Sequence, residues 1–245
     1  MSGADQHALL PRIDAVGDRC MLIGLGETVD PETSLRVFAF ARRLKEQPIP
    51  GIVDIVPAFT TVALHYQPEQ FGDAPFESLR ATVLERLQRP FETTQLATRT
   101  IEVPICYGGE FGPDLEDIAA QRSLSTEQVI ALHLRSPHRV YMLGFAPGFP
   151  FIGGLDPALV MPRRASPRTR IPPGSVAIAR DQTCIYPLET PGGWNLIGRT
   201  PLRLFDPGAT PPCVLAPGDS VRFVRIDEPS YQAMLEARSL AYTSR

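Results

Sequence analysis

The sequence predicts a two-domain α+β protein, in which a small N-terminal domain of helices and strands precedes a loop-rich β domain. Three observations support this prediction. The chain has 245 residues, 43% of them hydrophobic, which is enough to fill one or two cores. Up to about residue 92, segments with apolar residues at helical spacing alternate with segments at strand spacing. Beyond that point strand spacing dominates. The 26 prolines lie mostly beyond residue 100 and alternate with Val, Ile, Leu and Phe, which favours short strands between turns over disorder.

The first domain is expected over residues 12–95 and combines amphipathic helices with strands. Residues 31–45 place Phe38 and Leu44 on one side at helical spacing, with charged residues opposite. The glycine-bounded apolar run 20–25 predicts a buried strand. The other elements expected here are strands at 52–56 and 60–66 and a helix at 76–87. Because this domain carries no catalytic motif, we expect it to pack against the second domain or against another chain.

The second domain is expected over residues 98–240 as a barrel or sandwich of short strands, because Gly and Pro punctuate nearly every junction between its apolar runs. Ser125 and Gln128 have the spacing of a capping box at the start of a helix. The strands expected here span residues 98–105, 140–145, 175–179, 183–186, 202–205 and 220–226. The expected helices span residues 114–122, 125–134 and 230–237.

Charge and composition exclude several classes of protein. With 24 basic and 27 acidic residues the net charge is −3, whereas nucleic-acid-binding proteins usually carry a basic excess. No apolar run approaches the ~20 residues that cross a bilayer, and the first residues lack the pattern of a secretory signal. The cysteines at 20, 106, 184 and 213 form no C-x-x-C pair. We therefore expect a cytoplasmic protein with reduced thiols and no nucleic-acid, membrane or metal partner.

Several catalytic motifs are missing from the sequence. There is no G-x-x-x-x-G-K-[ST] loop for phosphates, and Gly24-Leu25-Gly26 lacks the third glycine of a dinucleotide-binding loop. Ser175 does not stand in G-x-S-x-G, and no two histidines are spaced i,i+4. His133 lies on the apolar side of its expected helix, where a hydrogen-bonded core histidine is favoured over a catalytic base.

The loop that follows the expected strand at 140–145 reads GFAPGFPF and is the first candidate for a binding site. Gly144 and Gly148 permit positive φ and close backbone approach, while Pro147 stiffens the loop. One interpretation is a rigid aromatic wall of a small-molecule pocket, and the alternative is a loop that closes the core. We expect Phe149 to face the pocket, and Phe145, at the end of its strand, to lie in the core.

A second loop carries four arginines between residues 163 and 170. The planar fork of arginine suits capture of a carboxylate or phosphate, although a charged run is often only a solvated loop. Prolines before, within and after this run keep it stiff. We take Arg163, Arg168 and Arg170 as candidates for binding an anion.

A third segment supplies directed polar groups around a Gly-Gly-Trp sequence. Gly192 and Gly193 precede Trp194, the only tryptophan, which is more often a core residue than a ligand stack. Its neighbouring polar candidates are Gln182, Tyr186 and Asn195, which carry the few hydrogen-bonding groups that such a pocket needs.

The runs FGPDLEDIA, VYMLGFAPGFPFIGGL, MPRRASPRTRIPPGSVAI and YPLETPGGWNLIGRTP resemble the allophanate hydrolase subunit 1 family, also called the 5-oxoprolinase B-subunit or Kip-inhibitor-like family. The resemblance covers about residues 12–228. It implies a small N-terminal α/β sandwich domain followed by a cyclophilin-like β-barrel domain. It also implies partners, namely a second cyclophilin-like carboxyltransferase subunit and a third subunit of the LamB/YcsF type.

The resemblance implies a subunit, inactive alone, of an ATP-dependent 5-oxoprolinase that opens 5-oxo-L-proline to L-glutamate. ATP would be used by the complex, with no cofactor bound by this chain. Arg163, Arg168 and Arg170 would then be candidates for the substrate carboxylate, and the polar groups near Trp194, together with Phe149, for its lactam. Two alternatives share the same motifs: a regulatory protein that inhibits a sensor histidine kinase, and a carboxyltransferase component of a urea carboxylase or allophanate pathway.

Overall fold

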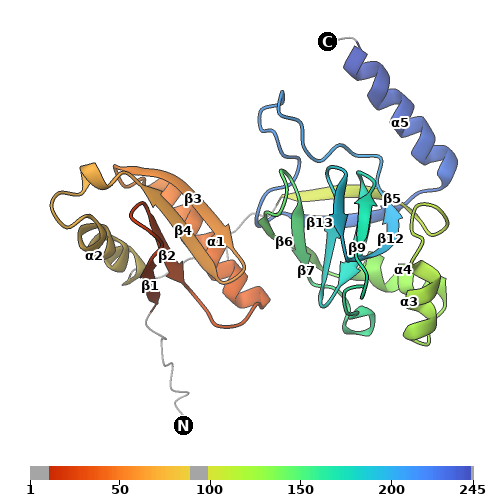
Figure 1. Cartoon of the computed structure of the whole chain (residues 1–245), viewed down its shortest axis with the longest axis horizontal. Coiled ribbons are helices and arrows are strands. Elements are labelled where there is room, and N and C mark those ends of the chain that lie inside the picture. Colours follow the sequence, from red (N-terminus) through yellow and green to blue (C-terminus); the bar gives the residue numbers. More distant parts are fainter. Residues whose placement is uncertain (1–10, 89–98, 244–245) are drawn as a thin grey trace, which may run out of the picture. The chain divides into compact units, whose positions relative to one another are not determined.

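A computed structural model describes residues 11–88 and 99–243 of the chain. Its internal contacts divide the chain into two compact units, residues 1–97 and 98–245, and the domain boundary expected between 95 and 98 lies outside the described residues. Figure 1 shows an open sheet with helices in the first unit and a closed barrel in the second. Across the described residues, no helix is both long and apolar enough to cross a membrane.

The first unit is an antiparallel four-stranded sheet of order β1-β2-β4-β3, with helices packed on it. On β2 and β4 alternate residues such as Met21, Ile23, Val62 and Leu64 are fully buried and form one core with the helices. The elements are β1 (Arg12–Ala15), β2 (Cys20–Gly24), α1 (Pro31–Glu46), β3 (Ile52–Ala58), β4 (Thr61–Tyr66), the 3₁₀ helix η1 (Pro68–Gln70) and α2 (Pro75–Gln88). All the expected helices and strands are confirmed, and β1, a short strand without an apolar alternation, is additional.

The second unit is a closed barrel of order β10-β7-β6-β13-β5-β12-β9, beside which β11 and β8 form a two-stranded ribbon. All pairings of these strands are antiparallel except that of β13 with β5. The strands are β5 (Thr100–Tyr107), β6 (His138–Leu143), β7 (Pro150–Gly153), β8 (Arg168–Ile171), β9 (Ser175–Ala179), β10 (Gln182–Ile185), β11 (Thr190–Gly192), β12 (Asn195–Arg199) and β13 (Ser220–Arg225). The α+β class and the barrel are thus confirmed.

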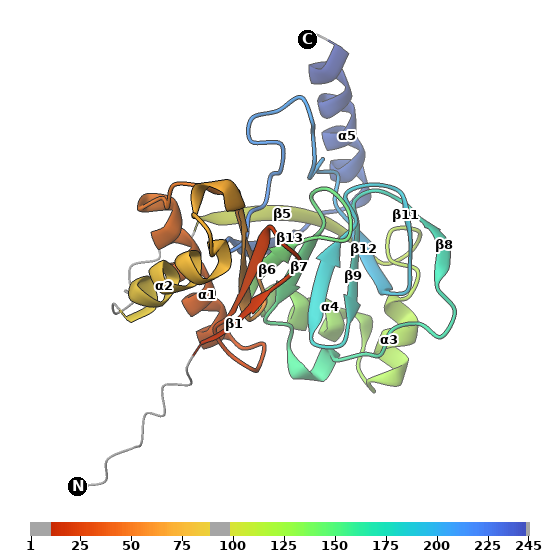
Figure 2. The same ribbon diagram turned by 60° about the vertical axis from the view of Figure 1, so that its left-hand side comes forward.

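In the described part of the second unit, the barrel is accompanied by the helices α3 (Leu115–Gln121), α4 (Thr126–Arg135) and α5 (Glu228–Thr243), with a 3₁₀ turn η2 (Pro157–Leu159). The predicted capping box is present at the start of α4, where the side chains of Ser125 and Gln128 each bond the other's backbone N–H. Apolar residues of α3 and α4 join the barrel core. Helix α5 instead extends beyond the barrel, with its C-terminal end pointing away, as Figures 1 and 2 both show.

The expected strand at 202–205 is wrong, because this segment forms only an isolated bridge between Phe205 and Cys213. Four strands of the second unit were not predicted: β7, β8, β11 and β12. Three to five residues long and rich in Gly, Pro or Arg, they carry too short an apolar alternation to be identified from the sequence. These segments form strands because they pair with segments that are many residues distant along the chain.

A chain of buried polar groups crosses the barrel interior. The Tyr107 hydroxyl lies 2.8 Å from Nδ1 of His133, and Nε2 of His133 lies 3.2 Å from Oγ1 of Thr183. Because Thr183 donates its own proton to the Ala177 carbonyl (2.9 Å), His133 donates from Nε2 and accepts at Nδ1 from Tyr107. Both ring nitrogens of His133 therefore have hydrogen-bond partners, and His133 is a neutral core residue, as predicted from the sequence. His138 lies beside it, with Nε2 2.7 Å from the His133 carbonyl.

We expect the free energy of unfolding to fall as the pH drops below about 6.5. Burial, together with the neighbouring His138 charge, holds the pKa of His133 well below its usual value, and burial lowers the pKa of His138 to about 4. The unfolded chain takes up these protons first, so each histidine adds a slope of up to about 1.4 kcal/mol per pH unit. Urea denaturation between pH 4.5 and 7 should show a shallower slope for His138→Gln. A wild-type slope in His138→Gln would contradict this account.

Candidate functional site

The outer face of the barrel carries an apolar row that the strand register aligns. Phe151 pairs with Cys184, Cys184 with Ala177, and Ala177 with Leu196, so these four side chains lie on one face across β7, β10, β9 and β12. The alternate residues of the same strands, such as Ile152, point into the barrel core. The outer row forms a separate buried cluster that the three predicted loops cover. Both faces of these strands are therefore buried.

Aromatic rings cover this row. Phe149 is 2% exposed, and its ring centroid lies 4.9 Å from that of Phe151, 5.1 Å from that of Tyr186 and 6.4 Å from that of Trp194. The planes are tilted or perpendicular, which is the arrangement that ring quadrupoles favour. The Arg163 guanidinium carbon lies 5.8 Å above the Trp194 ring, within the range of a cation–π contact.

Phe145 stands at the edge of this cluster in a strained conformation. Its φ is +70°, a left-handed value that costs a non-glycine residue free energy, and its side chain is 66% exposed. Hydrogen bonds within the loop, from Gly144 N–H to Phe149 O and from Ala146 N–H to Gly144 O, hold it there. The expected orientation of the two phenylalanines was wrong: Phe149 is in the core, and Phe145 faces outward with its ring centroid 5.2 Å from that of Phe149. The bend at Pro147–Gly148 reverses the chain and exchanges the two faces.

A single buried carboxylate anchors the arginine loop. Asp114, 2% exposed at the start of α3, accepts both terminal nitrogens of Arg168 at 2.8 Å and one terminal nitrogen of Arg164 at 2.5 Å. It also accepts the Leu196 backbone N–H at 2.7 Å. Charge-assisted, bidentate contacts of this kind are strong and directional. Asp114 therefore joins α3, the arginine loop and β12, and sequence reasoning did not identify it as a site residue.

The structure distinguishes between the three candidate arginines. Arg168 is engaged by Asp114, and Arg170 forms a two-fold ion pair with Glu189 at 3.0 Å. Among the described residues Arg163 has no carboxylate partner and is exposed. Arg163 is thus the arginine whose geometry leaves it available for a ligand anion.

Several of the remaining predicted residues have structural partners. Asn195 donates to the carbonyls of Pro162 (2.9 Å) and Ile178 (3.2 Å), so it ties the arginine loop to β9. Tyr186 lies directly against Gly192, whose lack of a side chain makes room for the phenol. Gln182 pairs with Ala179 and is half-buried at the edge of the face. Gly193 accepts the Arg164 N–H at 2.7 Å, which closes the contact between the two loops.

Two titratable side chains of this face, Tyr186 and Cys184, are held in their neutral forms. Burial raises the pKa of Tyr186, which keeps the phenol neutral, and burial raises the pKa of the Cys184 thiol well above its usual value. A thiol held neutral is a poor nucleophile. Within the described part of the chain, no group of three or more His, Cys, Asp or Glu side chains is arranged to hold a metal ion.

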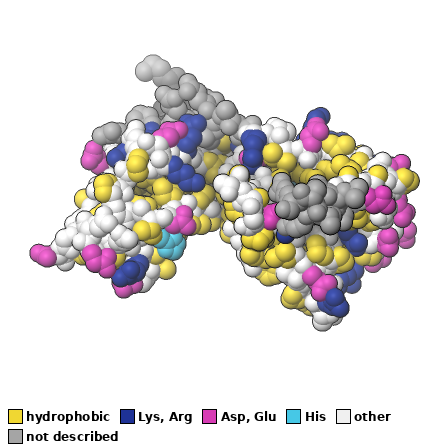
Figure 3. All heavy atoms as spheres, turned by 90° about the horizontal axis from the view of Figure 1, so that it is seen from above, with side chains coloured by type: hydrophobic (Ala, Val, Ile, Leu, Met, Phe, Trp, Pro, Cys, Tyr) yellow, Lys and Arg dark blue, Asp and Glu magenta, His cyan; other side chains and the backbone are white. Residues whose placement is uncertain are grey.

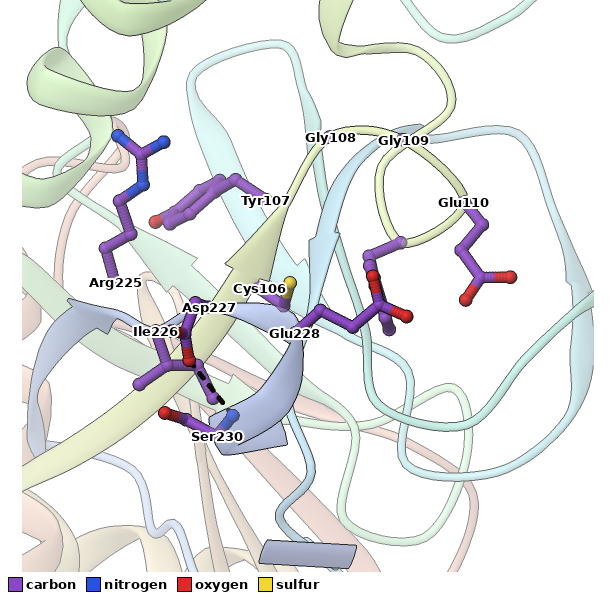
Figure 4. A pocket seen from close by; sticks show the side chains of 11 residues that line it. Cys106, Tyr107, Gly108, Gly109, Glu110, Arg225, Ile226, Asp227, Glu228 and Ser230 are labelled. Atoms are coloured by element: carbon purple, nitrogen blue, oxygen red, sulfur yellow. Dashed lines mark hydrogen bonds between the residues drawn. The ribbon is translucent and has the colours of Figure 1, made fainter. Parts of the chain in front are cut away.

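A second candidate lies at the ends of β5 and β13 and was not expected from the sequence. This cavity of about 660 Å³ is lined by the Gly108–Gly109 turn, Cys106 and the start of α5 (Figure 4). The carboxylates of Glu110, Asp227 and Glu228 line it together with the guanidinium of Arg225, which pairs with Glu127. Burial first, and then the negative charges of Glu228 and Asp227, raise the pKa of the Cys106 thiol, so it is not an activated nucleophile. We call this the acidic cavity.

The fold and this outer face define a class: a small α+β unit joined to a closed seven-stranded barrel that presents an aromatic, arginine-bearing loop surface. The sequence matches the family model described as carboxyltransferase domain, subdomain C and D, over residues 11–215. The chain belongs to this carboxyltransferase-domain family. It is 47% identical over 232 residues to the 5-oxoprolinase B-subunit of Bacillus subtilis (strain 168), and the match covers 92% of this chain and 97% of that protein.

Solved structures agree with this assignment. The crystal structure of TTHA0988 matches with a TM-score of 0.75 and 40% identity, over 86% of this chain and 40% of that one, so this chain spans less than half of that longer protein. The K. lactis urea amidolyase matches with a TM-score of 0.69 at 20% identity, over 92% of this chain and 15% of that chain, which supports the fold alone. The family resemblance that the quoted motifs indicated is confirmed.

Asp114→Asn should lower the free energy of unfolding by about 3 kcal/mol, because it leaves two arginines next to a buried neutral amide. Arg164 and Arg168 keep 33% and 26% of their side chains exposed, which places the cost at the low end for a broken buried pair. Glu189→Gln is the matched control, since it breaks a two-fold ion pair that is exposed, and it should change stability little. Equal urea midpoints for the two variants would show that Asp114 is not an anchor.

The two phenylalanines should respond differently to truncation. Phe149→Ala should cost about 3–5 kcal/mol of folding free energy, the usual range for a buried ring. Phe145→Gly should change stability by less than about 1 kcal/mol, because relief of the strained φ offsets the flexibility that glycine adds to the unfolded chain. Thermal and urea denaturation of the two variants measures this difference. A loss in Phe145→Gly as large as that in Phe149→Ala would place both rings in the core.

Proposed function

We propose that this protein is a subunit of a cytoplasmic, ATP-dependent 5-oxoprolinase and is inactive alone. The observation that carries the proposal is the exposed, strained Phe145 on the same loop-covered face as Arg163, which has no carboxylate partner in the described part of the chain. Strain of this kind persists where the surroundings enforce it, and it is concentrated at functional sites. The full-length similarity to a protein named as a 5-oxoprolinase B-subunit supplies the reaction.

The chemistry of the substrate explains why the aromatic face alone is insufficient for the reaction. The lactam of 5-oxoproline is resonance-stabilised, so its opening by water requires activation. Transfer of a phosphoryl group from ATP to the amide oxygen would supply it. A first water then adds to the ring carbon, and the ring C–N bond breaks as the nitrogen takes up a proton. A second water displaces phosphate from the resulting acyl phosphate to give glutamate. These steps need a nucleophile position and a phosphate site beyond the aromatic face itself.

In this proposal the aromatic face binds and orients, and partner subunits complete the site. Arg163, whose guanidinium stands over the Trp194 ring, would pair with the substrate carboxylate. Phe145 would pack on the ring or on the partner. The partners are a second cyclophilin-like carboxyltransferase subunit and a LamB/YcsF-type subunit.

Reconstitution tests the proposal. The purified chain should show no ATP-dependent release of glutamate from 5-oxoproline, and activity should appear when both companion subunits are added. In the reconstituted complex, Arg163→Ala should lower kcat/KM by roughly ten- to a hundredfold, the effect of losing one charge-assisted hydrogen bond. Arg170→Ala, whose guanidinium Glu189 already engages, is the matched control and should leave kcat/KM unchanged.

Two results would refute the proposal. Glutamate release by the chain alone would show that it is not a dependent subunit. Full assembly of the three subunits without 5-oxoproline turnover would show that the reaction belongs to another substrate. Equal activity of Arg163→Ala and Arg170→Ala would leave the subunit assignment intact and remove Arg163 from the site.

A further inference from the structure

A pocket of about 630 Å³ lies between α5 and the barrel, and neither the reaction nor the loop face uses it. Three arginines line it: Arg199 at the end of β12, Arg203 in the segment that follows, and Arg238 on α5. The other lining side chains are mainly prolines and leucines, and no Asp or Glu is among the described residues that line it. We call it the arginine pocket.

One stripe of α5 forms a wall of this pocket. Tyr231, Leu235 and Arg238 are spaced by four and three residues, so they lie on the same side of the helix, and all three line the pocket. Tyr231 is 5% exposed, and its ring lies 4.8 Å from that of Phe111, which fixes the first turn of α5 against the barrel. Further along, Arg238 donates to the Pro201 carbonyl at 2.5 Å. The pocket is therefore bounded by contacts at both ends.

Two of the three positive charges in this pocket, those of Arg199 and Arg238, have no carboxylate partner among the described residues. Arg199 donates to the Glu110 carbonyl at 3.3 Å and lies 5.7 Å above the Phe111 ring, and its Nε is buried without a hydrogen-bond partner among the described residues. Within the same described part, neither Arg199 nor Arg238 forms an ion pair. Arg203, by contrast, has a carboxylate nearby, that of Asp206 at 3.7 Å.

The two cavities beside Phe111 have opposite charge. Three carboxylates (Glu110, Asp227 and Glu228) and one guanidinium, that of Arg225, line the acidic cavity of Figure 4, whereas three guanidinium groups and no carboxylate line the arginine pocket among the described residues. Phe111 lines the first, Tyr231 lines the second, and their rings are in contact. An anion is therefore repelled by one cavity and attracted by its neighbour. Charged side chains that served only to keep the surface solvated would not need to be separated in this way.

We propose that the arginine pocket binds the phosphate or polyphosphate group of a phosphorylated small molecule. A lone carboxylate satisfies one arginine fork, whereas three arginines match a group with more acceptor oxygens and more charge. The volume exceeds what inorganic phosphate fills and lies within the range of small-molecule sites. The proline and leucine walls, including Pro172, Leu188 and Leu202, provide an apolar surface for the remainder of the ligand. This inference rests on the pocket and is independent of the proposed lactam chemistry.

Calorimetric titration of the full-length chain with sodium triphosphate, at constant ionic strength, tests the site. The chain should bind triphosphate, and Arg238→Gln and Arg203→Gln should each weaken binding by about tenfold or more. Arg222→Gln is the matched control, because Arg222 is an exposed arginine outside the pocket that pairs with Glu102. Arg199→Gln is a further variant, but Arg199 also packs on Phe111. Because Arg238 is exposed, its variant should keep the wild-type melting temperature.

Parallel titrations identify the source of the phosphate. ATP binding more tightly than triphosphate would support a nucleotide held by both the arginines and the apolar wall, and equal affinity would support a site for the polyphosphate alone. Three outcomes would overturn the proposal: no triphosphate binding by the folded wild-type chain, equal binding by the pocket variants and Arg222→Gln, or preference for glutamate or a poly-glutamate peptide over triphosphate.

Discussion

The loop face of the barrel depends on one buried carboxylate. Asp114 receives two arginines and a backbone N–H from segments that are 50 to 82 residues apart from it in the sequence. Without this contact the arginine loop would lose its strongest connection to the barrel, and the Trp194 ring would lose the loop that covers it. An ion pair so enclosed contributes modestly to net stability, because desolvation opposes it, but it fixes one arrangement of the loops. The geometry of the candidate site follows from this arrangement.

Burial of both faces of the short strands is the second constraint. A strand with one exposed face alternates apolar and polar residues. The sequences of β9, β10 and β12 show little of this alternation, because one set of side chains fills the barrel and the other set supports the aromatic rings. This leaves almost no polar position on these strands for catalysis. Functional groups are therefore confined to loops, where Phe145 and Arg163 stand.

Electrostatics separates the barrel surface into distinct regions despite a net charge of only −3. The face shown in Figure 3 mixes acidic, basic and apolar side chains, in keeping with this balance. The acidic cavity and the arginine pocket nevertheless lie on either side of the Phe111–Tyr231 contact. Local segregation of charge, and not the total, thus determines what each cavity can accept.

The sequence by itself determined the class, the helices and the longer strands, because each of these depends on a periodic pattern within a few residues. It also located the three loops that the structure brings together. Only the tertiary structure decided that Phe145 faces outward and Phe149 inward, and that Asp114 engages Arg168 while Arg163 has no such partner among the described residues. It likewise revealed the short strands β7, β8, β11 and β12 and the two cavities around α5. These features depend on pairings between distant segments and on a turn that reverses one loop, and no local pattern encodes either.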